Sequence, residues 1–269
     1  MSKPTTLAVD IRNHVAIVWF NRPEIHNALN DVVIAEMRAL FKVLARDRGV
    51  RAMVLAGHGK SFCAGGDLKW MKLTSTSSKA KSTRDAQALA ETLWALASFP
   101  KPTVARVHGN AYAGGMGFVA ACDMAIASVE ATFCLSEVKL GLIPAVISPY
   151  VVRAMGERAA GRYFLSAERF DAAEAYRIGF VHDICLPGEL DDRINDLLGH
   201  LVLGGPRAIA ESKKLIALSG GTRLTPAVRA ATARRIAETR ACAEGREGIA
   251  SFLEKRAPSW VAELESGEN

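Results

Sequence analysis

The chain has 269 residues, of which 49% are hydrophobic and 23% are charged, and its formal net charge is +6. This composition is that of a globular protein and excludes disordered and fibrous classes, and no uncharged apolar run reaches the roughly 18 residues of a membrane-spanning helix. The positive charge fits a polyanionic partner, which could be a nucleic acid or a phosphorylated small molecule.

Cysteine use and the first residues indicate a reducing compartment. The five cysteines are odd in number and show no CxxC spacing, and no apolar signal core follows Met1 to Pro4. We therefore expect free thiols, no metal site and a cytoplasmic protein.

Apolar patterning predicts an alternation of strands and helices. Apolar or alternating runs predict strands over residues 7–11, 15–20, 51–56, 103–107, 124–127 and 132–135. Apolar residues at helical spacing predict a helix capped by Asn30 and further helices over residues 85–97, 151–165 and 172–178. Residues 74–83 carry almost no large apolar side chain, which predicts a mobile loop.

No strand is predicted from Pro206 onward. Helices are predicted over residues 206–218, 226–242 and 247–255, with Thr225 as an N-cap. The change divides the chain into a core, residues 1–205, and a helical region, residues 206–269. The strand–strand–helix rhythm of the core predicts an α/β fold of stacked turns.

Two glycine segments each follow a predicted strand and open into a helix. They are FCAGGDLK at 62–69 and GNAYAGGMG at 109–117. Glycine lets the backbone approach a ligand closely and expose N–H groups. Either segment alone is explained by a compact turn. The two together predict paired N–H donors aimed at one oxygen, as a thioester enolate requires.

Glu137 lies a short way downstream and could move a proton. We interpret Asp67 and Asp123 as structural residues at helix ends. The six histidines form no HxxxH pair and accompany no nucleophile elbow, and the second glycine segment lacks GxGxxG spacing. The pattern therefore gives no support to a metal hydrolase, a catalytic triad or a dinucleotide fold.

Four segments together resemble the crotonase (enoyl-CoA hydratase/isomerase) superfamily over nearly the full chain. They are NRPEIHNALN at 21–30, SFCAGGDLKW at 61–70, GNAYAGGMGFVAACD at 109–123 and SEVKLGLIP at 136–144. The resemblance implies a spiral of ββα turns and a C-terminal helical region that mediates trimers, often paired into hexamers. It also implies catalysis through a CoA thioester enolate, with coenzyme A as part of the substrate and no separate cofactor.

The resemblance also assigns site residues. The oxyanion donors fall on the N–H groups of Gly66 and Gly114, and Glu137 is the catalytic carboxylate. Candidate substrate or CoA contacts are Asn27, Ala28, Leu29, Ala64, Gly65, Asp67, Leu68, Lys69 and Gly117. Phe252 and Lys255 are candidates for contacts from a neighbouring subunit.

The sequence departs from the family at Gly117, where typical hydratases carry a first glutamate. The segment 141–175 resembles the bacterial 3-methylglutaconyl-CoA hydratase branch, which favours hydration of a branched enoyl-CoA with a distal carboxylate. Compensation for the missing glutamate would come from that carboxylate, an ordered water, or a hydroxyl such as Ser148 or Tyr150. A single-glutamate enoyl-CoA isomerase is the alternative, and decarboxylase or thioester hydrolase chemistry stays open.

A different class is an RNA-binding protein. Arg38, Lys42 and Arg46 recur at helical spacing, and residues 223–246 are arginine-rich. We interpret both as solvated or inter-subunit faces, because no interleaved aromatic residues or nucleic-acid motif accompany them. A nucleic-acid partner is therefore not expected.

Overall fold

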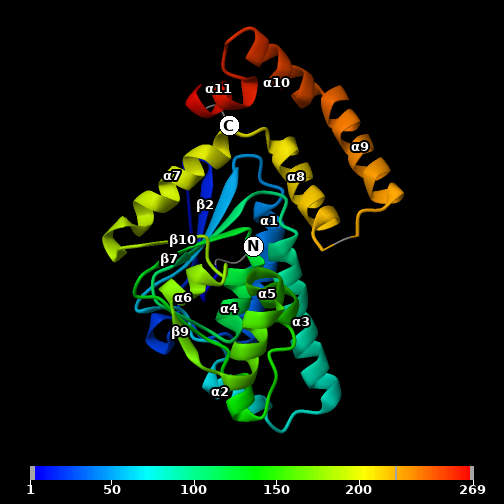
Figure 1. The fold of residues 1–269 in the computed structure, drawn as a ribbon. Coiled ribbons are helices and arrows are strands. Elements are labelled where there is room, and N and C mark those ends of the chain that lie inside the picture. Colours follow the sequence, from blue (N-terminus) through cyan, green and yellow to red (C-terminus); the bar gives the residue numbers. More distant parts are fainter. Residues whose placement is uncertain (1–3, 222, 267–269) are drawn as a thin grey trace.

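A computed structural model describes residues 4–221 and 223–266 (Figure 1). Its larger sheet has the strand order β1-β2-β3-β5-β7-β10. The β1–β2 pair is antiparallel and the other neighbours are parallel. These strands are Leu7–Arg12 (β1), Val15–Phe20 (β2), Ala52–Gly57 (β3), Thr103–Val107 (β5), Met124–Ser128 (β7) and Asp183–Cys185 (β10).

A smaller sheet has the order β4-β6-β8-β9, with only β8–β9 antiparallel. Its strands are Ser61–Cys63 (β4), Asn110–Tyr112 (β6), Thr132–Cys134 (β8) and Arg169–Asp171 (β9). The chain passes from the larger to the smaller sheet at β3–β4, β5–β6 and β7–β8, and a helix follows each passage. The predicted α/β fold class and its strand–strand–helix repeat are confirmed.

The helices are Asp31–Leu44 (α1), Leu68–Thr74 (α2), Lys79–Ala97 (α3), Gly114–Ala121 (α4), Ser148–Ser166 (α5), Ala172–Arg177 (α6), Leu190–Leu203 (α7), Pro206–Ser219 (α8), Pro226–Ala241 (α9), Ala243–Leu253 (α10) and Ser259–Ser266 (α11). Short 3₁₀ turns are Pro23–Ile25 (η1), Glu137–Leu140 (η2) and Pro187–Glu189 (η3). Asn30 and Thr225 cap α1 and α9 as predicted. None of the described helices is long and apolar enough to cross a membrane.

The loop predicted over residues 74–83 is wrong in its second half, because α3 already begins at Lys79. The Ser78 hydroxyl accepts a hydrogen bond from the Lys81 N–H at 3.3 Å, and Lys81 pairs with Asp85 at 2.9 Å. Caps and ion pairs of this kind stabilise an exposed helix start. The first turns of α3 therefore need no apolar contacts of their own.

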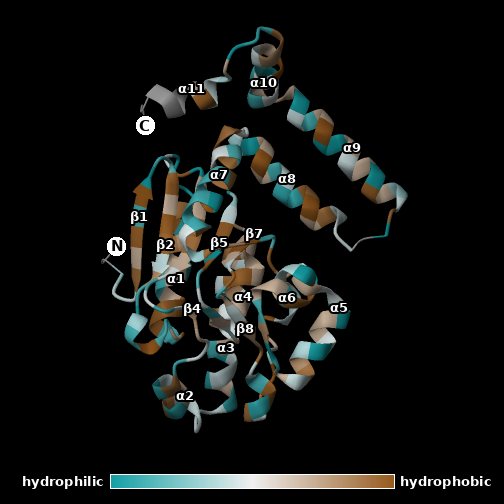
Figure 2. Cartoon of the chain, turned by 60° about the vertical axis from the view of Figure 1, so that its left-hand side comes forward, coloured by the Kyte–Doolittle hydropathy of each residue, from teal (hydrophilic) through white to brown (hydrophobic). Residues whose placement is uncertain are grey.

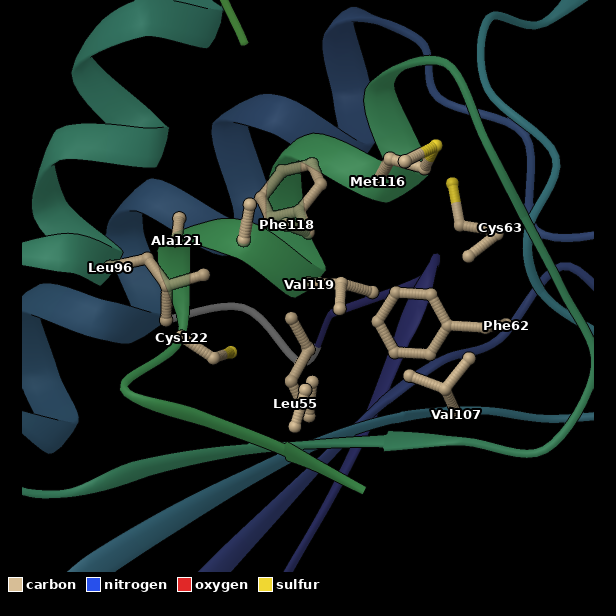
Figure 3. Packing of buried hydrophobic residues seen from close by; sticks show 14 of the residues in the cluster. Leu55, Phe62, Cys63, Leu96, Val107, Met116, Phe118, Val119, Ala121 and Cys122 are labelled. Carbon is tan, nitrogen blue, oxygen red and sulfur yellow. The ribbon is translucent and has the colours of Figure 1, made fainter. Parts of the chain in front are cut away.

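Strand β3 of the larger sheet is buried along its whole length, whereas β1, at the outer edge of that sheet in Figure 2, is mostly exposed. Met53 and Leu55 of β3 belong to a cluster that includes α4, whereas Ala52 and Val54 join residues of α7 in a second cluster. Two-sided burial explains why β3 reads as a continuous apolar run. Figure 3 shows the first cluster, with Phe62, Val107, Phe118 and Val119 among its labelled side chains. This packing fixes α4 against the strands that precede the glycine segments.

A half-buried cation joins the C-terminal helices to the core. The Arg51 guanidinium donates to the Val202 carbonyl at 3.2 Å and to the Gly204 carbonyl at 2.7 Å, at the end of α7. Cations are favoured at the last carbonyls of a helix. Beyond this joint, Lys213 of α8 also donates to the Asp123 carboxylate of the core at 2.6 Å, whereas α9 and α10 lie farther from the sheets (Figure 1). The predicted helical region, residues 206–269, contains no strand within its described residues.

Candidate active site

Three chain segments meet at one edge of the smaller sheet. The two glycine segments follow β4 and β6, and Glu137 follows β8. These three strands are neighbours and parallel, so their carboxyl ends lie at the same edge. The Ala113 N–H also donates to the Cys134 carbonyl at 2.8 Å, which joins the second glycine segment to the end of β8. The structure thus places Gly66, Gly114 and Glu137 in adjoining segments.

The N–H of Gly66 points away from its neighbouring segment. Leu29 forms a parallel bridge with Gly66, in which the Leu29 N–H donates to the Gly65 carbonyl at 2.7 Å and the Leu29 carbonyl accepts from the Asp67 N–H at 2.8 Å. Peptide groups of an extended chain alternate in direction, so the Gly66 N–H faces the opposite side. Gly66 is exposed, and its N–H donates to no acceptor in the described part of the chain. It is open to a ligand oxygen.

Glycine is required where the two segments touch. Gly65 has a φ of +92°, and a Cβ there would lie 2.9 Å from the Ala113 Cβ. A Cβ on Gly115 would lie 2.3 Å from the Cys63 carbonyl oxygen. Both distances are too short for a side chain. The close approach holds the start of α4 directly against the first glycine segment.

Ala113 turns the chain sharply from β6 into α4. It is an alanine with a φ of 47° and a ψ of −119°, and no side chain caps the helix there. Such a conformation costs about 1–3 kcal/mol and persists where the surroundings impose it. Gly114 follows as the first residue of α4, where an N–H has no acceptor within the helix. The helix dipole favours negative charge at this point.

Glu137 is the carboxylate of the site. Its Oε2 atom is buried and has no hydrogen-bond partner among residues 4–221 and 223–266. Burial raises the pKa of Glu137, although its own backbone N–H partly opposes the shift. A buried carboxylate without a partner is costly, so its retention suits a group that exchanges a proton with a ligand.

The first candidate CoA contacts form the wall beside Gly66. Asn27 is buried, and its amide donates to the carbonyls of His58 at 2.8 Å and Ser61 at 2.7 Å while accepting from the Arg22 N–H at 2.9 Å. Its side chain is thus committed to shaping the backbone. Ala28 and Leu29 are buried, Gly65 is buried and Ala64 is half-buried. Leu68 and Lys69 are exposed at the start of α2.

The site contains an ion pair that sequence reasoning missed. Arg22 donates to the Asp67 carboxylate at 2.8 Å and to the Ala28 carbonyl at 2.7 Å, and both charged side chains are largely buried. Asp67 also caps α2 as predicted, accepting from the N–H groups of Lys69 and Trp70. Burial alone would raise the pKa of Asp67, but the Arg22 bond and the backbone N–H bonds outweigh it and the pKa is lowered.

Arg22 therefore ties Asp67, the residue after Gly66, to Ala28 in the neighbouring segment. In the sequence, Arg22 was marked only by its place beside Pro23 in the segment at 21–30. No local pattern indicated that its partner, Asp67, lies 45 positions away. The planar guanidinium donates through two nitrogens to two separate acceptors, which fixes both its direction and its distance.

We expect Arg22→Ala to lower kcat about tenfold or more, because a small displacement of an oxyanion donor has a large effect on rate. It should also cost up to about 3–5 kcal/mol of stability, since it leaves a buried carboxylate unpaired. Arg22→Lys should restore part of the stability and less of kcat. The control is Arg12→Ala, whose pair with Asp10 is exposed. A variant with lower Tm but normal kcat and KM would assign Arg22 to folding alone.

Neither Gly117 nor the side chains proposed to compensate for it supply a second catalytic carboxylate beside Glu137. Gly117 is buried in α4, opposite Ile147. The Ser148 hydroxyl donates to the Ala145 carbonyl at 2.8 Å, so its proton is already committed. Burial raises the pKa of Tyr150, which stays protonated at neutral pH.

Phe252 and Lys255 are not brought to this site within the chain. They lie at the end of α10, at the opposite end of the molecule from α2, as both ribbon views show (Figures 1 and 2). Phe252 is 82% exposed. Their contact with a neighbouring subunit's ligand stays a prediction.

The fold, with two backbone N–H groups beside a half-buried carboxylate, suits an enzyme that stabilises an oxyanion and moves a proton. The family model described as enoyl-CoA hydratase/isomerase matches residues 10–263. The chain belongs to the enoyl-CoA hydratase/isomerase family.

Relatives agree with this assignment. A crystal structure of an enoyl-CoA hydratase from Shewanella pealeana superimposes with a TM-score of 0.94 at 40% identity, covering 96% of this chain and 97% of that chain. The (E)-benzylidenesuccinyl-CoA hydratase of Thauera aromatica is 30% identical, covering 96% of this chain and 98% of the relative. The 2,3-dehydroadipyl-CoA hydratase of Escherichia coli is 30% identical, covering 94% and 98%.

Proposed function

We propose that this enzyme adds water across the double bond of an α,β-unsaturated acyl-CoA. The thioester oxygen binds between the N–H groups of Gly66 and Gly114. Glu137 takes a proton from water as the hydroxyl oxygen bonds to Cβ, and the electron pair of the double bond moves into an enolate. The two N–H groups stabilise the charge on the enolate oxygen. Glu137 then returns the proton to Cα, which balances the addition.

The unpartnered Oε2 of Glu137 is the observation that carries this proposal. A carboxylate whose pKa is raised by burial is a stronger base than an exposed one and can both accept and return a proton. It follows the strand next to those that present Gly66 and Gly114. One group can therefore serve both proton transfers of the reaction.

We further propose that the substrate is 3-methylglutaconyl-CoA or a related branched enoyl-CoA with a distal carboxylate. Residues 141–175 resemble that hydratase branch. The names of two relatives, (E)-benzylidenesuccinyl-CoA hydratase and 2,3-dehydroadipyl-CoA hydratase, also denote thioesters of dicarboxylic acids. These observations support a carboxylated substrate class.

A panel of enoyl-CoA thioesters, read by mass spectrometry and proton NMR, tests the reaction. We expect a gain of one water, with the highest kcat/KM for branched, carboxylated members. Migration of the double bond without a mass change would replace hydration by isomerisation. Loss of carbon dioxide or release of free CoA would assign decarboxylase or thioester hydrolase chemistry.

The isomerase alternative is favoured by one observation. Ile147 faces Gly117, so the site offers one carboxylate. Moving a proton between C2 and C4 needs a single base, whereas the usual hydratase pair of carboxylates holds the water at two points. The same panel should include a β,γ-unsaturated thioester, whose conversion to the α,β isomer would reveal this activity.

We propose that the protein is a homotrimer or a dimer of trimers. Large apolar side chains of α8, α9 and α10 are exposed, among them Ile216, Ile236, Phe252 and Leu253. Exposed apolar surface of this kind marks an interaction site. Light scattering after size exclusion should give a mass of three or six chains, and Phe252→Asp should shift it toward the monomer.

A further inference from the structure

The side chain of a second residue fills the space beside Gly117. A Cβ placed on Gly117 would lie 2.2 Å from the Ile147 Cγ2 atom and 2.8 Å from its Cβ. Separations below 3.0 Å are essentially never seen for real Cβ atoms. Leu93 lies on the same side, with its Cδ1 at 3.7 Å. The side chain of Ile147 therefore occupies the place that a side chain at 117 would take.

Moving the Ile147 side chain away from Gly117 would be energetically costly. Its side chain branches at Cβ and has few rotamers, and it is 3% exposed. Its carbonyl accepts hydrogen bonds from the N–H groups of Tyr150 and Val151, both at 3.1 Å, at the start of α5. Because the Ile147 Cβ is itself too close, a rotamer change cannot make room. The backbone of residue 147 or of α4 would have to move.

The segment that contains Ile147 carries no side chain that could replace a carboxylate. Residues 141–147 have the sequence GLIPAVI, without a carboxylate, amide or hydroxyl side chain. The next residue, Ser148, donates its hydroxyl proton to the Ala145 carbonyl at 2.8 Å. The segment that faces Gly117 therefore offers no charged acceptor for a water.

We infer that Ile147 limits this site to one carboxylate, and that the second hydrogen-bond acceptor for the attacking water is a carboxylate of the substrate itself. This inference rests on the proposed hydration. The substrate carboxylate accepts a hydrogen bond from the water proton that Glu137 does not take, and that proton stays on the new hydroxyl. The addition keeps the same atom balance. Ile147 is accordingly a specificity-determining residue for thioesters of dicarboxylic acids.

Paired substrates test the role of the substrate. Glutaconyl-CoA and trans-2-pentenoyl-CoA have the same chain length and differ by a terminal carboxylate in place of a methyl group. We expect wild-type enzyme to hydrate glutaconyl-CoA with a kcat/KM about tenfold higher or more, the range of one hydrogen bond to a charged group. Equal values for the two thioesters would overturn the inference.

A double-mutant cycle tests Ile147. Gly117→Ala should lower the Tm in the wild-type background and have little effect in an Ile147→Gly background, which removes both the Cγ2 and the Cβ of residue 147. The pair Gly117→Glu with Ile147→Gly should raise the kcat/KM for trans-2-pentenoyl-CoA tenfold or more above Ile147→Gly alone. Gly117→Gln with Ile147→Gly is the isosteric control and should give a smaller gain, because a neutral amide oxygen accepts a weaker hydrogen bond from the water than a carboxylate does.

The two proposals can fail separately. If wild-type enzyme adds water to no enoyl thioester, the proposed function fails, while the Tm cycle still decides whether Ile147 closes position 117. If hydration is observed but Gly117→Glu alone matches the double variant in Tm and rate, Ile147 is not the barrier and the inference is overturned.

Discussion

Glu137→Gln is expected to lower kcat by about 10²–10⁴-fold, because it removes the one group placed to carry the proton. The amide has nearly the shape of the carboxylate, so binding of the thioester should change little. The effect should therefore appear in kcat rather than in KM. Initial rates with a hydrated enoyl-CoA, together with binding of a saturated acyl-CoA, measure both quantities.

The matched control is Glu130→Gln, which removes an exposed carboxylate from the same part of the chain. It should leave kcat unchanged. Near-normal turnover by Glu137→Gln would rule out Glu137 as the proton carrier and would shift attention to a substrate-derived base.

The same substitution predicts a pH-dependent gain in stability. The pKa of Glu137 is higher in the folded state than in the unfolded state. Ionisation of Glu137 therefore lowers the free energy of unfolding at pH values above the folded-state pKa, and this loss disappears as the pH falls below the unfolded-state pKa. Glu137→Gln should therefore have a higher Tm than wild type at neutral and alkaline pH, with the difference vanishing in acid. Calorimetry across this range measures it. A Tm difference independent of pH would contradict the raised pKa.

Local patterns in the sequence predict most of the elements and the two glycine turns of the candidate site. Short strands followed by paired glycines predict the two turns, and Asn30 and Thr225 have the residue types that cap helices. The strand pairing that places the turns side by side is also regular, because consecutive parallel strands form neighbours. These features depend on residues close together in the chain.

The contacts that define the chemistry of the site are long-range, and the sequence does not indicate them. Arg22 meets Asp67 across 45 positions. The side chain that closes Gly117 comes from Ile147, which looks like any apolar residue of a loop. Glycine at 117 shows that a glutamate is missing, but only packing shows that its space is filled.

The close contact between α4 and β4 predicts that Gly115→Ala will be among the most damaging substitutions outside Glu137. Helix propensity alone would favour alanine by about 1 kcal/mol. However, the new Cβ would lie 2.3 Å from the Cys63 carbonyl oxygen and 3.0 Å from the Cys63 Cβ, and both residues are buried. Relief requires α4 to move away from β4. Overpacking of this kind costs about 1–3 kcal/mol.

The displacement separates the Gly114 N–H from the Gly66 N–H, which lie on the two sides of that contact. Because a shift of about 1 Å in a catalytic group can cost about 10²-fold in rate, kcat should fall by that order. Gly199→Ala is the matched control, since a Cβ there meets nothing within 4 Å in the interior of α7. It should stabilise the protein by about 0.5–1 kcal/mol without changing kcat. If Gly115→Ala behaved in the same way, the spacing of the two backbone donors would not depend on the contact between α4 and β4.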